Sequence, residues 1–202
     1  MKISTISEYV QTATSIAQDD LAWIHANLEG LSIKGEHRHR IPGQLFDLSI
    51  EHHSGIITLI SMRTYASAFA LVRCAFECFV RGAWLHYCAS DDDIEAFVEK
   101  DIIAPRFGAL ISAIEERPEF AGKFLSTVKD GAWNAMNGYT HGGVHQVSRR
   151  LQGDYIEPAF EDASLLEVIR FCRTMALIAF GQIAGLAGRS DLVDQATDRM
   201  KN

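Results

Sequence analysis

Three charged residues interrupt an apolar stretch in the middle of the chain. Arg73, Glu77 and Arg81 follow one another at four-residue intervals, and His86 lies five residues further on. At about 100° per residue the first three fall on one face of a helix. Charged side chains are rarely buried unless they are paired. The set is therefore either an Arg–Glu–Arg ladder at the solvated edge of a helix or a polar slot in the core that holds an anion or a catalytic partner.

A second candidate lies where the next long helical pattern ends, in the sequence NGYTHGGVH at residues 137–145. His141 precedes Gly142 and Gly143, which allow backbone or ligand to approach closely. The carbonyl groups at a helix C-terminus favour a protonated imidazole. His141 and His145 have the spacing of a helical metal pair, but the two glycines argue against a helix and no third ligand follows at a metal-binding spacing. A surface or capping role for His141 is the simpler alternative.

A third pair, Arg170 and Arg173, lies in the apolar segment LLEVIRFCRTMALIAF. Two arginines in such a segment need acceptors, and Glu77 or Glu167 could supply them. An isolated buried charge costs several kcal/mol, so we expect Arg73, Glu77 and His141 to meet in one polar pocket with Arg170 or Arg173 close by. The alternative is a structural ion pair between helices.

The elements that must position these residues are helices, because apolar residues recur at intervals of three and four almost throughout. We predict a first helix opened by a capping box at Thr5 and Glu8 and then a polar loop over residues 31–43. Further helices are predicted over residues 44–62, 65–89, 90–104, 105–116, 118–139, 164–188 and from 190 onward. Ser164 and Ser190 are the predicted caps of the last two. Glycine-rich residues 140–163 are expected to be irregular. The sequence predicts one all-α domain over residues 1–202, a bundle of about six to eight helices with the helix over 65–89 at its centre.

Composition narrows the function classes. The chain has 202 residues, 48% of them hydrophobic and 22% charged, which excludes disordered and fibrous proteins. The net charge of −7 excludes nucleic-acid binding through the overall field, so any contact with RNA would have to be local. The longest uncharged apolar stretch, residues 174–188, is too short to cross a bilayer. The N-terminus lacks the apolar core of a signal peptide. We expect a cytoplasmic protein without membrane contact, with four reduced cysteines.

Two of these segments together resemble the HEPN-like helical proteins of bacteria. The resemblance rests on Arg73–Glu77 and on Asn137–Gly143, within about residues 60–145. Many HEPN-like proteins are uncharacterised, and others are defence- or toxin-associated ribonucleases. Their catalytic pattern is an arginine followed after four to six residues by a histidine, and Arg81 and His86 match it in letters. On a straight helix, however, those two side chains would point ~140° apart.

The resemblance implies a metal-independent ribonuclease or toxin that acts on RNA as a homodimer, without a cofactor. Arg73, Glu77 and His141 would be its catalytic residues. A histidine would move a proton, and an arginine would hold the phosphate. The supporting residues would be Arg81, His86, His145, Arg170 and Arg173. Two alternatives stay open. One is a non-catalytic helical module that binds a protein partner or a small ligand. The other is a metal-dependent hydrolase that uses Glu77, His86, His141 and His145.

Overall fold

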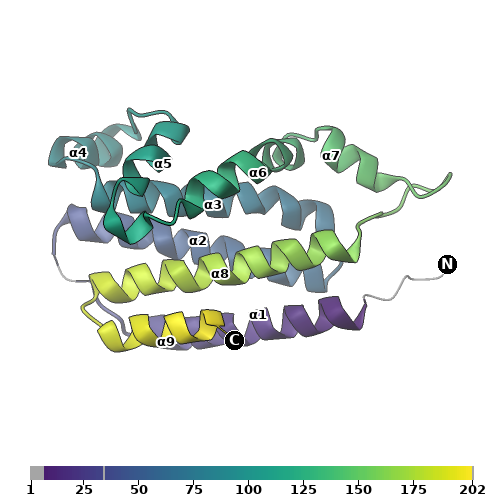
Figure 1. Ribbon diagram of the computed structural model, residues 1–202, viewed down its shortest axis with the longest axis horizontal. Coiled ribbons are helices and arrows are strands. Elements are labelled where there is room, and N and C mark those ends of the chain that lie inside the picture. The colour runs from purple at the N-terminus through teal and green to yellow at the C-terminus, as the bar shows by residue number, and fades with distance from the viewer. Residues whose placement is uncertain (1–6, 34, 202) are drawn as a thin grey trace.

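The structure, a computed structural model, describes residues 7–33 and 35–201, and within these ranges the chain is an all-α bundle without strands (Figure 1). The predicted fold class is therefore correct. The nine α-helices of the described residues are α1 (Glu8–Leu28), α2 (His37–Ser61), α3 (Tyr65–Tyr87), α4 (Asp91–Lys100), α5 (Phe107–Glu115), α6 (Phe124–Thr140), α7 (Val144–Val147), α8 (Asp162–Leu186) and α9 (Ser190–Lys201), with short 3-10 turns η1 (Pro118–Phe120) and η2 (Ser148–Arg150).

The long helices α2, α3 and α8 form the centre of the bundle. In Figure 1, α1 and α9 cover α8 on one side, and α5 and α6 lie against α3 on the other. Helix α3 is apolar almost all round, and the side chains predicted to be buried on it are at most 6% exposed. They are Phe69, Val72, Phe76, Phe79, Val80, Ala83 and Trp84. The prediction of a central third helix is thus confirmed, and α3 is a rigid support for the charged residues that it carries.

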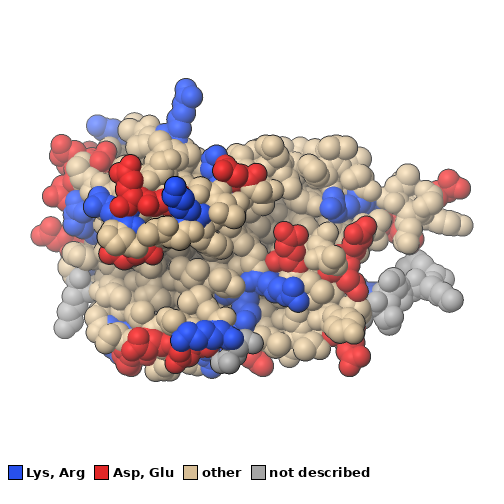
Figure 2. All heavy atoms as spheres, viewed as in Figure 1, with Lys and Arg blue, Asp and Glu red and all other residues tan. Residues whose placement is uncertain are grey.

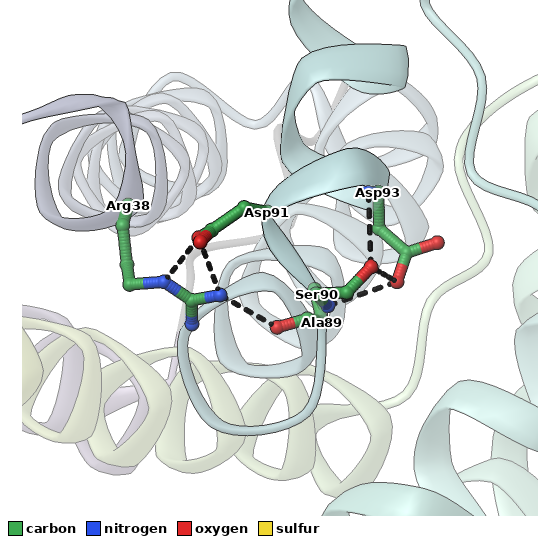
Figure 3. Close-up of polar contacts among 5 residues, drawn as sticks. All are labelled: Arg38, Ala89, Ser90, Asp91 and Asp93. Carbon is green, nitrogen blue, oxygen red and sulfur yellow. Dashed lines mark hydrogen bonds and ion pairs between the residues drawn. The ribbon is translucent and has the colours of Figure 1, made fainter.

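The start of α2 differs from the prediction, because the helix begins at His37 and passes through Pro42. A proline there removes one backbone hydrogen bond, but packing compensates, since Pro42 and Gly43 are both buried. A Cβ atom on Gly43 would collide with Ile33. Arg38 also fixes this end of the helix (Figure 3). Its guanidinium donates to Asp91 at 2.8 Å and to the carbonyl of Ala89 at 3.0 Å, so α2 holds the turn between α3 and α4.

Several helix ends also differ from the sequence pattern. Pro118 opens only the turn η1, and α6 begins at Phe124. Helix α8 begins at Asp162, so Ser164 is not its cap. By contrast, Ser90 and Asp93 form the predicted capping box of α4 (Figure 3). The predicted cap residue Thr5 lies outside the described residues, and Ser7 accepts from the backbone of Val10 at the start of α1.

Between the end of α6 and the start of α8, residues 141–161 are irregular apart from α7 and η2, close to the predicted range of 140–163. Residues 151–158 form an exposed loop closed by a bridge between Gln152 and Tyr155, and it projects beyond the end of the bundle (Figure 1). Its apolar side chains Leu151, Tyr155 and Ile156 are 56%, 74% and 83% exposed. No helix among the described residues is both long and apolar enough to cross a membrane, and all four cysteines are free thiols.

Helix α2 carries a histidine that is fully enclosed in the core. His53 is 0% exposed, its ring packs edge-on against Phe171, and neither ring nitrogen has a hydrogen-bond partner. Burial, with a smaller contribution from neighbouring His52, lowers the pKa of His53 from its ordinary 6.5 to about 3. His53 is therefore neutral in the folded protein under all but strongly acidic conditions.

This enclosed histidine predicts a loss of stability in mild acid. Below pH 6.5 the unfolded chain takes up a proton at His53 that the folded protein refuses until the pH nears 3. The free energy of unfolding is therefore at its full value above pH 6.5, where His53 is neutral in both states. As the pH falls from 6.5 to 5, the unfolded state gains the proton and the free energy of unfolding decreases by about 2 kcal/mol. His53→Leu should remove this part of the pH dependence in urea unfolding, whereas His52→Leu should retain it. Equal slopes for wild type and His53→Leu would contradict the prediction.

Candidate functional site

The structure brings Arg73, Glu77 and His141 together, although 68 residues separate the arginine from the histidine. On α3, Nε of Arg73 donates to Oε1 of Glu77 at 2.7 Å. Nη1 of the same guanidinium lies 2.9 Å from Nε2 of His141, the residue after α6. A guanidinium can only donate, so Nε2 accepts and the ring proton lies on Nδ1. The imidazole is therefore neutral, with its acceptor nitrogen towards α3.

A glycine turn fixes the position of His141. Gly142 has a φ of +67°, which favours glycine, and the chain turns back so tightly that the amide of Gly143 donates to the carbonyl of Gly138 at 2.7 Å. A Cβ atom on Gly143 would lie 3.0 Å from the Cα atom of Gly138. The hydroxyl of Thr140 donates to the carbonyls of Met136 and Ala70, and the second of these bonds joins the end of α6 to α3.

A stacked pair of aromatic rings supports the arginine, and one of the two rings contacts it directly. The guanidinium of Arg73 lies over the ring of Trp133, 5.0 Å from its centre, and Phe107 stacks on Trp133 at 4.6 Å. A cation over an indole face is attracted by its π electrons. Arg73 thus has an aromatic, a carboxylate and an imidazole partner at once, and it is held in one orientation.

The cluster lies at the surface rather than in a closed core slot. Arg73 and Glu77 are about three-quarters buried, whereas His141 is exposed. Arg81 lies one turn further along α3, with Nη2 3.5 Å from Oε2 of Glu77 and 44% of its side chain exposed. The Arg–Glu–Arg ladder predicted for α3 is therefore present. Together with His141, the ladder offers a neutral imidazole and two guanidinium groups to a ligand that arrives from solvent.

The remaining predicted residues of α3 and α7 lie apart from this contact. His86 follows Arg73 by 13 positions, about 20 Å along the helix. There burial lowers its pKa, with smaller contributions from His39 and Arg38. His145 is exposed in α7 and packs beside Gly138 and Tyr139. Among residues 7–33 and 35–201, no three His, Cys, Asp or Glu side chains lie close enough to hold a metal ion.

The expectation that Arg170 or Arg173 joins the cluster is wrong. Arg170 is exposed in a groove between α1 and α8. Arg173 binds Asp20 of α1 at 2.5 Å, and Arg199 of α9 binds the other oxygen of the same carboxylate at 2.6 Å. Arg173 also donates to the backbone carbonyl of Arg199 at 2.6 Å. This Asp20 clasp joins three helices on the side of the bundle away from α3.

Sequence reasoning missed Asp20, Trp133 and Phe107. A signal for Asp20 was present, because it falls between Ala17 and Ile24 on the apolar face of α1. A carboxylate at such a position needs a buried cation. Trp133 and Phe107 carry no comparable signal, since aromatic residues in helices most often belong to the core.

Comparison with known proteins identifies a family but no function. Residues 46–202 match a family described as a family of unknown function, DUF6988. No curated protein and no solved structure matches the chain.

Proposed function

The chain belongs to the DUF6988 family, and from its own side chains we propose that it is a metal-independent ribonuclease whose site is Arg73, Glu77 and His141. The observation that carries the proposal is the contact between the guanidinium of Arg73 and Nε2 of His141. It joins a phosphate-binding group and a neutral proton acceptor from two distant segments of the chain.

In the proposed reaction the phosphate of an RNA strand takes the Nη1 donor of Arg73, which releases Nε2 of His141. Nε2 then removes the proton of the adjacent 2′-hydroxyl, and the 2′ oxygen attacks phosphorus. The bond from phosphorus to the 5′ oxygen breaks, and that oxygen takes a proton from solvent. The products are a 2′,3′-cyclic phosphate and a free 5′-hydroxyl.

The arginines have separate parts in this reaction. Arg73 stabilises the charge that develops on the phosphate oxygens, because its planar fork matches two of them. Glu77 does not touch the substrate. It positions Arg73 through the 2.7 Å bond to Nε. Arg81, which is 44% exposed, is available for the next phosphate along the strand.

The test is cleavage of a single-stranded RNA oligonucleotide in the presence of EDTA. His141→Ala should lower the rate by at least about 100-fold, the usual worth of a positioned base, and chelator should have no effect. The melting temperature should be nearly unchanged, because His141 is exposed and surface changes cost little. The matched control is His25→Ala, which removes an exposed histidine at the far end of α1. Equal cleavage by wild type and His141→Ala would contradict the assignment.

One observation favours the second candidate, a module that binds another protein. The loop with Leu151, Tyr155 and Ile156 exposes three large apolar side chains beyond the bundle, and exposed apolar patches mark interaction surfaces. Absence of RNA cleavage by the wild-type protein would favour this candidate over the ribonuclease.

A further inference from the structure

A groove with a volume of about 410 Å³ opens between α6 and α8, and α3 forms its floor. Phe69, Val72 and Met136 lie at its base and are at most 5% exposed. Val168 and Phe171 of α8 form one wall. In Figure 2 uncharged atoms dominate the surface between these helices, and charged side chains flank it. Small-molecule sites typically have this volume and an apolar lining.

The groove exists because α6 presents small residues to α8. Gly131, Ala132 and Ala135 face it, and a Cβ atom built on Gly131 meets no atom within 4 Å. No side chain of the described residues fills this space, although neighbouring parts of α3 are tightly packed. Glycine inside a helix is also less stable than alanine. Keeping this space open with Gly131 therefore lowers the stability of α6.

One end of the groove carries an unused hydrogen-bond donor. Tyr139 lines the groove and is only 7% exposed, yet its hydroxyl makes no hydrogen bond within residues 7–33 and 35–201. Burial raises the pKa of Tyr139, so the hydroxyl stays protonated and able to donate. The hydroxyl oxygen is not among the fully enclosed unpaired atoms of the described residues, so it is open to solvent on the groove side and available to an acceptor on a ligand.

Arg149 places a positive charge at the same end. Its guanidinium lies 5.4 Å from the centre of the Tyr139 ring, and Nη1 donates to the carbonyl of His145. No carboxylate pairs with it within the described ranges. Glu167 also lines the groove and acts electrostatically on Tyr139. Its side chain is exposed whereas that of Arg149 is half-buried, and water screens an exposed charge more than a half-buried one.

We propose that this groove binds a small amphipathic anion, with its apolar body between α6 and α8 and its acidic head group at Tyr139 and Arg149. The body meets Val168 and Phe171, and the head group accepts from the phenol and the guanidinium. The site is separate from the Arg73–Glu77–His141 cluster, and the proposal does not depend on RNA cleavage.

Two fluorescent probes of nearly equal shape test the proposal. The anionic probe is 8-anilino-1-naphthalenesulfonate, and the neutral probe is N-phenyl-1-naphthylamine. Wild type should bind one equivalent of each. Gly131→Leu should lower the affinity for both probes at least tenfold by filling the groove. Arg149→Gln should lower the affinity for the anionic probe by about tenfold, in line with the loss of one charged hydrogen bond, and leave the neutral probe unaffected.

The matched control is Gly181→Leu, which adds the same side chain at a helical glycine outside the groove where a Cβ atom also meets nothing. It should bind both probes as wild type does. Thermal melts must show that each variant is folded, and Ala135→Leu replaces Gly131→Leu if that variant is not. Unchanged binding by the folded groove variant, or an equal loss in Gly181→Leu, would overturn the site. Equal losses of both probes in Arg149→Gln would overturn the acidic head group.

Discussion

Replacing Phe76 with alanine is expected to lower the free energy of unfolding by about 3–5 kcal/mol. The ring is 0% exposed at the middle of α3. It packs edge-on against Phe107 of α5 at 5.9 Å and against Phe171 of α8 at 6.2 Å. Its removal leaves a cavity that touches three helices, and a close-packed interior collapses only partly around such a void. Urea unfolding followed by circular dichroism measures the loss.

The control for this variant is Phe124→Ala, which removes the same side chain at a position that is 42% exposed. That change should cost less, because Phe124 keeps 42% of its surface in water when the protein folds and so buries less apolar area than Phe76 does. A loss below about 0.5 kcal/mol for Phe76→Ala, the size of an ordinary surface change, would show that α3 is not the centre of the core.

Replacing Asp20 with asparagine is expected to cost about 3 kcal/mol, at the lower end of the range for a broken buried ion pair. Asp20 is 4% exposed, and its two oxygens bind Arg173 and Arg199. Asparagine keeps the shape but removes the charge, so both guanidinium groups lose their counter-ion. The lower end applies because 36% of the Arg199 side chain is exposed, where water replaces part of the lost interaction.

Asp19→Asn is the matched control, since its side chain is exposed one position earlier on α1. It should leave the free energy of unfolding nearly unchanged. The Asp20 variant should also increase amide hydrogen exchange in α9 first, because Arg199 connects this helix to α1 and α8 and the lost contacts lower the free energy of its local opening. A loss of stability equal to that of Asp19→Asn would contradict a stabilising role for the clasp.

The sequence predicts best where one local pattern decides the outcome. The apolar residues around α3 require a buried helix, and the four-residue spacing of Arg73, Glu77 and Arg81 places them on one face. The meeting of His141 with Arg73 depends instead on the tight approach of Gly143 to Gly138. Spacing along the chain cannot supply that contact. It was expected only because isolated polar groups in an apolar bundle need partners.

The errors arose where tertiary contacts outweighed local signals. The sequence predicts Arg170 or Arg173 near the Arg73–Glu77–His141 cluster, with Glu77 or Glu167 as the acceptor. Arg173 instead binds Asp20, which is 4% exposed. Pro42 suggested a loop, but packing under Ile33 and the bonds of Arg38 extend α2 to His37. Both predictions depend on which segment packs against the residue in question. The apolar pattern of one helix does not contain that information.

The boundary of the family match does not coincide with a boundary of the folded bundle. The match begins at residue 46, inside α2, and omits α1. Yet α1 buries Val10, Ala17 and Ile24 in the bundle and supplies Asp20 to the clasp. Residues 46–202 alone would leave the side of α8 that packs on α1 uncovered, and Arg173 would lack the carboxylate of Asp20. The folded unit therefore extends beyond the matched residues on the α1 side, whereas both partners of the contact between Arg73 and His141 lie inside the match.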